Sequence, residues 1–450
     1  MACERAAVGS LAGHATGRPP STPTARLCYD TSVRPTAPVR IFTAAAAVHT
    51  LAGPDGPRSG AAMAELGTIP HGAVVVDDTG AIAWVGATSD LPASFADAEI
   101  IDCTGKTLMP AFVDAHTHLV WGGDRKDELE MRIAGADYER IFAAGGGILS
   151  SVRQTRAIDD DTLYAQSLVR IERMRRAGTT TFEIKSGYGL ELAAELRQLR
   201  VARRLGADFR VRTTCLAAHA VPAEARVSAA ARAAFIESIC AEILPAVARA
   251  NLADFADVFC DRGAFDVDES RRVLLAARAL GLGLRVHANE LGATGGAQLA
   301  AELGAASADH LLYVGDAERT ALREAGVVAI LLPGTSLVLG KPYADGRAMV
   351  EAGVPVAVAT DCNPGSCAFE NLAMVLALAC YGNRLSPAEA VCAATHNAAC
   401  SLGLGDRVGS LKPGRRADLL VLDTPDVRDL VYHAGSPLVG QVWQDGLRVA

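Results

Sequence analysis

Short apolar runs alternate with amphipathic stretches through most of the chain. The runs read as buried strands, because each is short and lies between glycine, proline or polar residues. They are expected at Phe112–Leu119, Thr179–Ile184, Val211–Leu216, Asp257–Cys260, Gly283–Ala288, Ser307–His310, Val327–Leu332 and Pro355–Thr360. The amphipathic stretches Asp161–Arg176 and Glu191–Leu205 are typical of helices between such strands.

Eight strands with helical crossovers, spread over roughly 250 residues, predict a parallel α/β fold, the TIM-like (β/α)8 barrel. We assign the barrel to residues 106–404. A doubly wound open sheet is the alternative, but no Gly-x-Gly-x-x-Gly follows the first strand to suggest a dinucleotide site. In a barrel of this kind the chemistry is expected at the carboxyl ends of the strands.

Both ends of the chain carry a different, β-rich pattern. Val39–Phe42 predicts a strand, residues 72–86 predict a hairpin, and residues 416–422 and 439–447 predict further strands. We therefore expect a small β-sandwich domain built from residues 37–105 and 405–450. Residues 1–36 are rich in Ala, Pro, Thr and Arg without a hydrophobic period, and they are expected to form a disordered N-terminal extension.

Composition narrows the class of partner. The 450 residues are half apolar and carry a formal net charge of −8, so the chain can bury a large core but has no basic footprint for nucleic acid or an anionic membrane. A small-molecule substrate is therefore expected, with no nucleic acid and no membrane partner. No apolar run reaches the roughly eighteen residues of a membrane helix. Eleven cysteines without Cys-x-x-Cys spacing favour a reducing, cytoplasmic location.

The first expected strand contains His116 and His118, two residues apart. On a strand these imidazoles point to the same face, and Pro110 before them and Gly122-Gly123 after them place the pair at the carboxyl end. A His-x-His pair alone is common on exposed strands. The pair is therefore informative only together with candidate ligands elsewhere.

Such candidates follow the other strands. His219 follows the third strand, His287 ends the fifth, His310 ends the sixth and Asp361 follows the eighth. Any one histidine could be a core or loop residue bonded to its neighbours, but their concentration at strand ends indicates a shared site. Three imidazoles and one carboxylate, with a position left for water, form a normal catalytic metal site. We predict one metal ion, Zn²⁺ or Fe²⁺/Fe³⁺, bound by His116, His118, His287 and Asp361.

Glu290 and His310 are expected to transfer protons beside this metal. Glu290 lies three residues after His287, where a carboxylate could carry protons or hold an amide nitrogen; an acid at a helix N-terminus is the other interpretation. The predicted catalytic residues are Glu290, His310 and Asp361. The fourth strand ends without the lysine that a carbamylated two-metal site would need, and Lys185 on the second strand is expected to form an ion pair. One metal ion is therefore favoured.

Assembled in this way, the chain resembles the amidohydrolase superfamily through Met109–His118, the fifth-strand histidine and the eighth-strand aspartate. A closer resemblance is carried by longer stretches, namely 145–150, 183–190, 286–290, 308–311, 332–335 and 359–366. Through these stretches the chain resembles the family of enzymes that hydrolyse the cyclic amide of 4-imidazolone-5-propanoate to N-formimidoyl-L-glutamate in histidine degradation. The resemblance implies a homodimer and six substrate-binding residues: Arg125, Tyr188, His219, Asn363, Gly365 and Ser366. Glu290 joins the predicted substrate-binding residues because its carboxylate could hold an amide nitrogen.

Two other functions stay open at this point. Deaminases that act on a purine, a pyrimidine or a related heterocycle share the same metal motif, so the motif alone does not separate ring opening from ammonia release. A non-catalytic scaffold of the same fold is the third possibility, although such a relative would be expected to lack at least one ligand.

Overall fold

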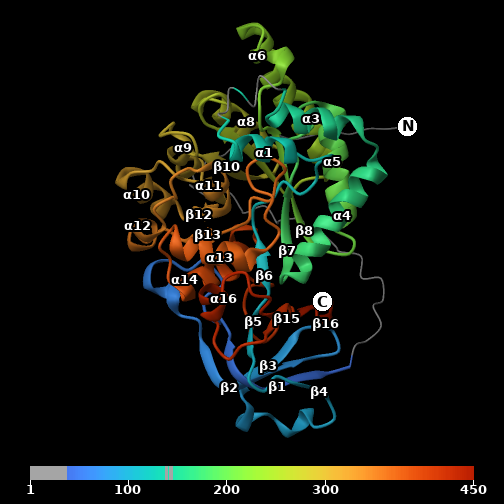
Figure 1. Ribbon diagram of the computed structural model, residues 1–450, viewed down its shortest axis with the longest axis vertical. Coiled ribbons are helices and arrows are strands. Elements are labelled where there is room, and N and C mark those ends of the chain that lie inside the picture. The colour runs from blue at the N-terminus through green and yellow to red at the C-terminus, as the bar shows by residue number, and fades with distance from the viewer. Residues whose placement is uncertain (1–37, 137–139, 141–144) are drawn as a thin grey trace, which may run out of the picture. The chain divides into compact units, whose positions relative to one another are not determined.

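The structure, a computed structural model, describes residues 38–136, 140 and 145–450 (Figure 1). The extension expected over residues 1–36 lies outside this range. Among the described residues, none of the helices combines the length and the apolar composition that a membrane crossing requires.

Eight parallel strands form the barrel, and each pairs with the next one along the chain. They are β6 (Phe112–Asp114), β7 (Thr179–Lys185), β8 (Arg210–Ala218), β9 (Phe255–Cys260), β10 (Gly283–Ala288), β11 (Ser307–His310), β12 (Val328–Leu331) and β13 (Val356–Val358). Beyond β6 and β13, Thr117 bridges Cys362 and the Asp361 amide donates to the His116 carbonyl at 3.0 Å. The predicted (β/α)8 barrel is confirmed, and these contacts join its first and last strands near the expected site.

Burial on both faces explains why these strands read as apolar runs. Every residue of β7, β11, β12 and β13 is buried. Seven of the expected strands agree with the structure to within two residues at each end. The first was predicted too long, because the chain leaves the regular ladder after Asp114. There the Thr117 amide donates to the Glu183 carboxylate at 3.1 Å and the Thr117 hydroxyl to the Glu183 carbonyl at 2.6 Å.

Helices connect the strands (Figure 1). In chain order they are α1 (Lys126–Ile133), α3 (Ile148–Ala157), α4 (Asp160–Arg176), α5 (Leu192–Leu205), α6 (Ala229–Ser238), α7 (Leu244–Arg249), α8 (Val267–Ala279), α9 (Gly296–Glu302), α10 (Asp316–Ala325), α11 (Pro333–Leu339), α12 (Gly346–Glu351), α13 (Leu372–Tyr381), α14 (Pro387–Ala393), α15 (His396–Ser401) and α16 (Asp429–Tyr432). The two predicted helices correspond to α4 and α5 within one residue. Asp159 fixes the start of α4 by accepting from the Thr162 amide at 2.7 Å.

The two ends of the chain share one mixed sheet. Its strands are β1 (Arg40–His49), β2 (Thr68–Val76), β3 (Ile82–Ala87), β4 (Glu99–Asp102), β5 (Thr107–Pro110), β14 (Leu419–Leu422), β15 (Val439–Gln444) and β16 (Leu447–Arg448). The expected hairpin is the antiparallel pair of β2 and β3. The boundary placed at residue 105 stays a prediction; β5, which lies beyond it, pairs with β1 and β14 of this sheet.

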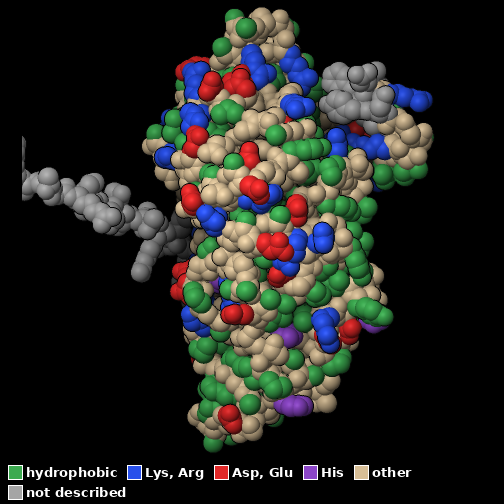
Figure 2. Space-filling model, turned by 90° about the vertical axis from the view of Figure 1, so that its left-hand side faces the viewer, with side chains coloured by type: hydrophobic (Ala, Val, Ile, Leu, Met, Phe, Trp, Pro, Cys, Tyr) green, Lys and Arg blue, Asp and Glu red, His purple; other side chains and the backbone are tan. Residues whose placement is uncertain are grey.

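The surface mixes charges of both signs. On the face shown in Figure 2, the side chains of Lys and Arg lie interspersed with those of Asp and Glu and with apolar groups. A surface of this kind gives no local excess of one sign on that face to attract a polyanion.

Candidate metal centre and active site

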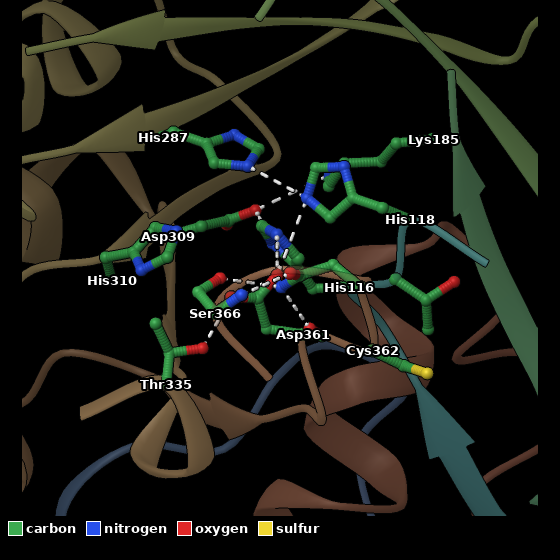
Figure 3. A network of polar contacts seen from close by, with 12 residues as sticks. His116, His118, Lys185, His287, Asp309, His310, Thr335, Asp361, Cys362 and Ser366 are labelled. Atoms are coloured by element: carbon green, nitrogen blue, oxygen red, sulfur yellow. Dashed lines mark hydrogen bonds and ion pairs between the residues drawn. The ribbon is translucent and has the colours of Figure 1, made fainter. Parts of the chain in front are cut away.

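The four predicted metal ligands lie together at or beyond the carboxyl ends of β6, β10 and β13 (Figure 3). The Nε2 atoms of His116 and His118 each lie 3.5 Å from Oδ1 of Asp361, and those of His118 and His287 are 3.4 Å apart. All four side chains are buried. Ligand atoms about 2.1 Å from a tetrahedral ion are about 3.4 Å from one another, so this spacing suits a zinc or iron ion.

Two buried carboxylates hold the histidine rings in this orientation. Oδ2 of Asp309, on β11, lies 2.6 Å from Nδ1 of His116, and Oδ2 of Asp257, on β9, lies 3.0 Å from Nδ1 of His287. An Nδ1–H that donates to a carboxylate leaves the Nε2 lone pair free for a metal. Nε2 of His116 is buried and has no hydrogen-bond partner among the described residues. The donor set therefore fits a metal ion.

Asp257 and Asp309 were not identified from the sequence. The one sequence feature that could have identified them is a carboxylate within an otherwise apolar strand, in Ala256-Asp257-Val258 and in Ala308-Asp309-His310. The ion pair expected for Lys185 is confirmed, since its Nζ lies 2.9 Å from Oδ2 of Asp257.

Backbone geometry at the site is strained. His310 has φ 74° and Asp361 has φ 53°, in the left-handed region that side chains other than glycine rarely adopt. Such residues cost on the order of 1–3 kcal/mol each and persist only where their surroundings hold them. Asp361 is held by the hydrogen bond that its backbone N–H donates to the His116 carbonyl at 3.0 Å, and by the Thr335 hydroxyl, which donates to its Oδ2 at 2.5 Å. The strained conformation of Asp361 therefore lowers the stability of the fold but places this carboxylate in the cluster.

Burial also sets the protonation of the imidazoles. It lowers the pKa of His116, His118 and His310 well below the usual value, and nearby positive groups act in the same direction. His287 differs: burial lowers its pKa, but the charge and hydrogen bond of Asp257 outweigh burial and raise it. Neutral imidazoles are the form that binds a metal.

Metal binding is expected to weaken as the pH falls. Burial raises the pKa of Asp361 to about 6, so below that pH a proton competes with the metal for the carboxylate. His287, whose pKa is also raised, adds a second competing proton. Each proton weakens the apparent affinity by up to about tenfold per pH unit. Competition against a coloured chelator from about pH 8 down to about pH 5 measures the effect. An affinity that stays constant over this range would contradict the ligand set.

Tyr188 and His219 adjoin the candidate ligands. The ring of His219 stacks on that of His118 with centroids 4.8 Å apart, and the ring of Tyr188 lies 5.5 Å from that of His219. Nδ1 of His219 donates to the Gly187 carbonyl at 3.1 Å, which leaves its Nε2 for another partner. Gly187 has φ 112°, and an added Cβ would lie 2.8 Å from the His219 ring. The loop after β7 therefore needs glycine to approach this ring.

Arg125 and the loop 363–366 form a second group. An added Cβ on Gly365 would lie 1.8 Å from Nη1 of Arg125, so the guanidinium occupies the space that glycine leaves. Glu128 accepts from Nη2 of Arg125 at 2.6 Å and from the Gly147 amide at 3.0 Å. The Asn363 side chain binds the amides of Gly365 and Ser366 at 2.8 and 2.7 Å, and its Nδ2 donates to the Ser366 hydroxyl at 2.8 Å. These contacts hold the loop that follows Asp361 against Arg125.

Glu290 and His310 face each other beside the cluster. Oε2 of Glu290 lies 3.6 Å from Nε2 of His310. Burial, with the negative charge of Asp361, raises the pKa of Glu290 to about 8. At neutral pH this carboxyl group therefore carries a proton that it can donate.

The chain is similar to known proteins over most of its length. Residues 107–449 match the model of the Amidohydrolase family. An imidazolonepropionase from Desulfotalea psychrophila is 45% identical over 398 residues, which cover 87% of this chain and 95% of that relative. An imidazolonepropionase from Deinococcus deserti is 46% identical over 394 residues, covering 88% and 96%.

Solved structures show the fold. A crystal structure of an adenosine deaminase from Xanthomonas campestris with bound zinc superposes with a TM-score of 0.65 at 22% identity, covering 91% of this chain and 92% of that one. At this level of identity the likeness supports the fold and not the reaction.

Proposed function

The chain belongs to the imidazolonepropionase family of amidohydrolases, and from this membership we propose that its buried histidine and aspartate cluster opens the ring of 4-imidazolone-5-propanoate to give N-formimidoyl-L-glutamate. The observation that carries the proposal is about 45% identity to curated imidazolonepropionases over nearly the whole chain. A heterocycle deaminase is the weaker candidate, because its support is a likeness of fold. A non-catalytic scaffold is weaker still, since all four candidate ligands are present.

His116, His118, His287 and Asp361 are the proposed ligands of one ion, with zinc and iron both suited to imidazole and carboxylate. When bound, such an ion polarises a water molecule and lowers its pKa from near 15.7 toward roughly 7. Asp361 would accept, on its carboxylate, the proton that a water molecule gives up as the water oxygen bonds to the amide carbon.

Two neighbours complete the step. His310, as a neutral imidazole, donates a hydrogen bond to the oxygen on which negative charge develops. Glu290 donates a proton to the ring nitrogen as the bond between carbon and nitrogen breaks. Its raised pKa supports this role, because the acid form is present at neutral pH.

The remaining residues hold the substrate. Arg125 suits the propionate carboxylate, since a guanidinium pairs with a carboxylate through two parallel hydrogen bonds. Tyr188 and His219 offer hydrogen bonds to the five-membered ring. The loop formed by Asn363, Gly365 and Ser366 borders the same space and keeps Arg125 in place.

Replacing Arg125 by Met is expected to raise KM more than it lowers kcat. A hydrogen bond to a charged group contributes about 1.5–3 kcal/mol, which corresponds to roughly a 10- to 100-fold rise in KM. Glu128→Gln, which weakens the contact that holds the guanidinium, should shift KM in the same direction by less. The measurement is KM and kcat for the propionate substrate and for an analogue whose carboxylate is amidated. A loss confined to the propionate substrate is the result expected if Arg125 binds the carboxylate. Equal losses on both substrates would contradict a role in binding the carboxylate.

The direct test is incubation of metal-loaded protein with freshly made imidazolone propionate. Loss of the ring chromophore with formation of N-formimidoyl-L-glutamate is the expected result. Release of ammonia without ring opening would instead favour the deaminase, and a protein that binds no metal would favour the scaffold.

Three broader features are also part of the proposal. The partner is a small molecule, in keeping with a site built from buried side chains. A homodimer follows from family resemblance. A cytoplasmic location is supported by the nine cysteines within the described residues, all of which are free thiols.

A further inference from the structure

Five charged side chains are buried together inside the barrel, beside the candidate metal ligands. They are Glu183, Lys185, Asp257, Arg285 and Asp309, and each is at most 1% exposed. Nζ of Lys185 lies 2.9 Å from Oε1 of Glu183, 2.9 Å from Oδ2 of Asp257 and 3.7 Å from Oδ2 of Asp309. One ammonium group thus contacts three carboxylates. Burial of so much charge is costly unless every group is paired, so the arrangement calls for an explanation.

Two of these carboxylates are the ones that orient metal ligands. Oδ2 of Asp257 lies 3.0 Å from Nδ1 of His287 in an ion-pair contact, and Oδ2 of Asp309 accepts a hydrogen bond from Nδ1 of His116 at 2.6 Å. Lys185 therefore contacts both of these carboxylates, and Figure 3 shows its side chain pointing toward the cluster that contains Asp309. Mutation of a carboxylate that accepts a hydrogen bond from a metal-binding histidine typically lowers metal affinity or activity by about 10- to 100-fold.

The same carboxylates could also hold a cation themselves. One ligand atom each from Asp257, His287 and Asp309 lies within 4.8 Å of the others, a spacing that a second metal ion would accept. The three carboxylates carry a formal charge of −3, which Lys185 and Arg285 reduce to −1. Without the ammonium the formal charge would be −2, which one divalent ion would balance.

We propose that Lys185 is a positioning residue whose ammonium group stands where a second metal ion would otherwise bind, so that the site holds one metal and its two histidines stay oriented. The inference rests on the metal site of the proposed function. The positive charge fixes Asp257 and Asp309, and these fix His287 and His116. It also repels any other cation from the same oxygen atoms.

The test is metal stoichiometry and affinity in Lys185→Met. Wild type is expected to bind one equivalent of Zn²⁺ per chain. The variant is expected to bind a second equivalent, measured by elemental analysis after titration and gel filtration. It should also bind the first equivalent about 10- to 100-fold more weakly in chelator competition. A variant that takes up only one equivalent, or that binds it with wild-type affinity, overturns the proposal.

Two further variants keep the test decisive. Arg58→Met removes a buried cation that donates to the carbonyls of Leu51 and Ala52 at 2.7 and 3.0 Å, away from the carboxylates, and should leave stoichiometry at one. If Lys185→Met does not fold, Glu183→Gln with Lys185→Met restores the formal charge of −1 while keeping Asp257 and Asp309. Because the ammonium is gone and Asp257 and Asp309 still offer two carboxylates at its position, that double variant should still take up a second equivalent, more weakly than at a formal charge of −2. A single equivalent overturns the proposal. Wild type that binds no metal would instead overturn the proposed function.

Discussion

Asp361→Asn is expected to lose the tightly bound metal and to lower kcat/KM by about 10⁴-fold or more, because one change removes a ligand and the proton acceptor. A positioned proton acceptor alone contributes about 10²- to 10⁴-fold. The neutral amide is also a weaker ligand than the carboxylate whose Oδ1 lies 3.5 Å from both His116 and His118. Metal content by elemental analysis and the rate of ring loss measure the two effects separately.

Asp114 offers a matched control for this change. It is another buried aspartate, at the end of β6, and it accepts from the Thr360 hydroxyl at 2.6 Å. The Thr360 amide also donates to Oδ1 of Asp114 at 3.2 Å. The oxygen of Asn can keep that bond while its NH2 group donates to the Thr360 hydroxyl, which can rotate to accept, and Asp114 is outside the proposed ligand set. Asp114→Asn should therefore keep its metal and most of its activity. If Asp361→Asn kept its metal as well, Asp361 would not be a ligand.

The sequence was sufficient to predict the barrel because its strands are buried on both faces. A strand such as β7 shows as a continuous run, and the helices between the strands show their own periodicity. The terminal sheet was predicted less completely. Neither β4 nor β5 was identified: each has four residues, and β5 ends in proline, a residue that weakens any strand prediction. The structure identifies both as strands because each forms a parallel pair with β1.

The candidate site was predictable only in part, for a related reason. Histidines at strand ends can be found from the sequence, because a barrel brings all its carboxyl strand ends together. The bond between His116 and Asp309 joins residues 193 positions apart, and it depends on which side of β11 faces the barrel interior. A short apolar run does not specify that side. The carboxylates that orient the ligands therefore required the structure.

Glu290→Gln is expected to keep its metal while kcat falls by about 10²- to 10⁴-fold, the range for loss of a positioned proton donor. The carboxyl group lies at the edge of the cluster and faces His310, so glutamine can fill its space without donating a proton. Glu389→Gln, which changes a buried glutamate in the cap of α14, is the control and should have little effect on kcat. Loss of metal from Glu290→Gln would contradict a role outside the ligand set.

The pH profile gives the same residue a second, independent test. Because burial raises the pKa of Glu290 to about 8, the group is protonated below that pH and loses its proton above it. If protonated Glu290 is the donor to the ring nitrogen, kcat should fall as the pH rises through about 8 in wild type, and this alkaline limb should be absent from Glu290→Gln. His310→Ala should also keep its metal and have a lower kcat. A limb that persists unchanged in Glu290→Gln would assign proton donation to another group.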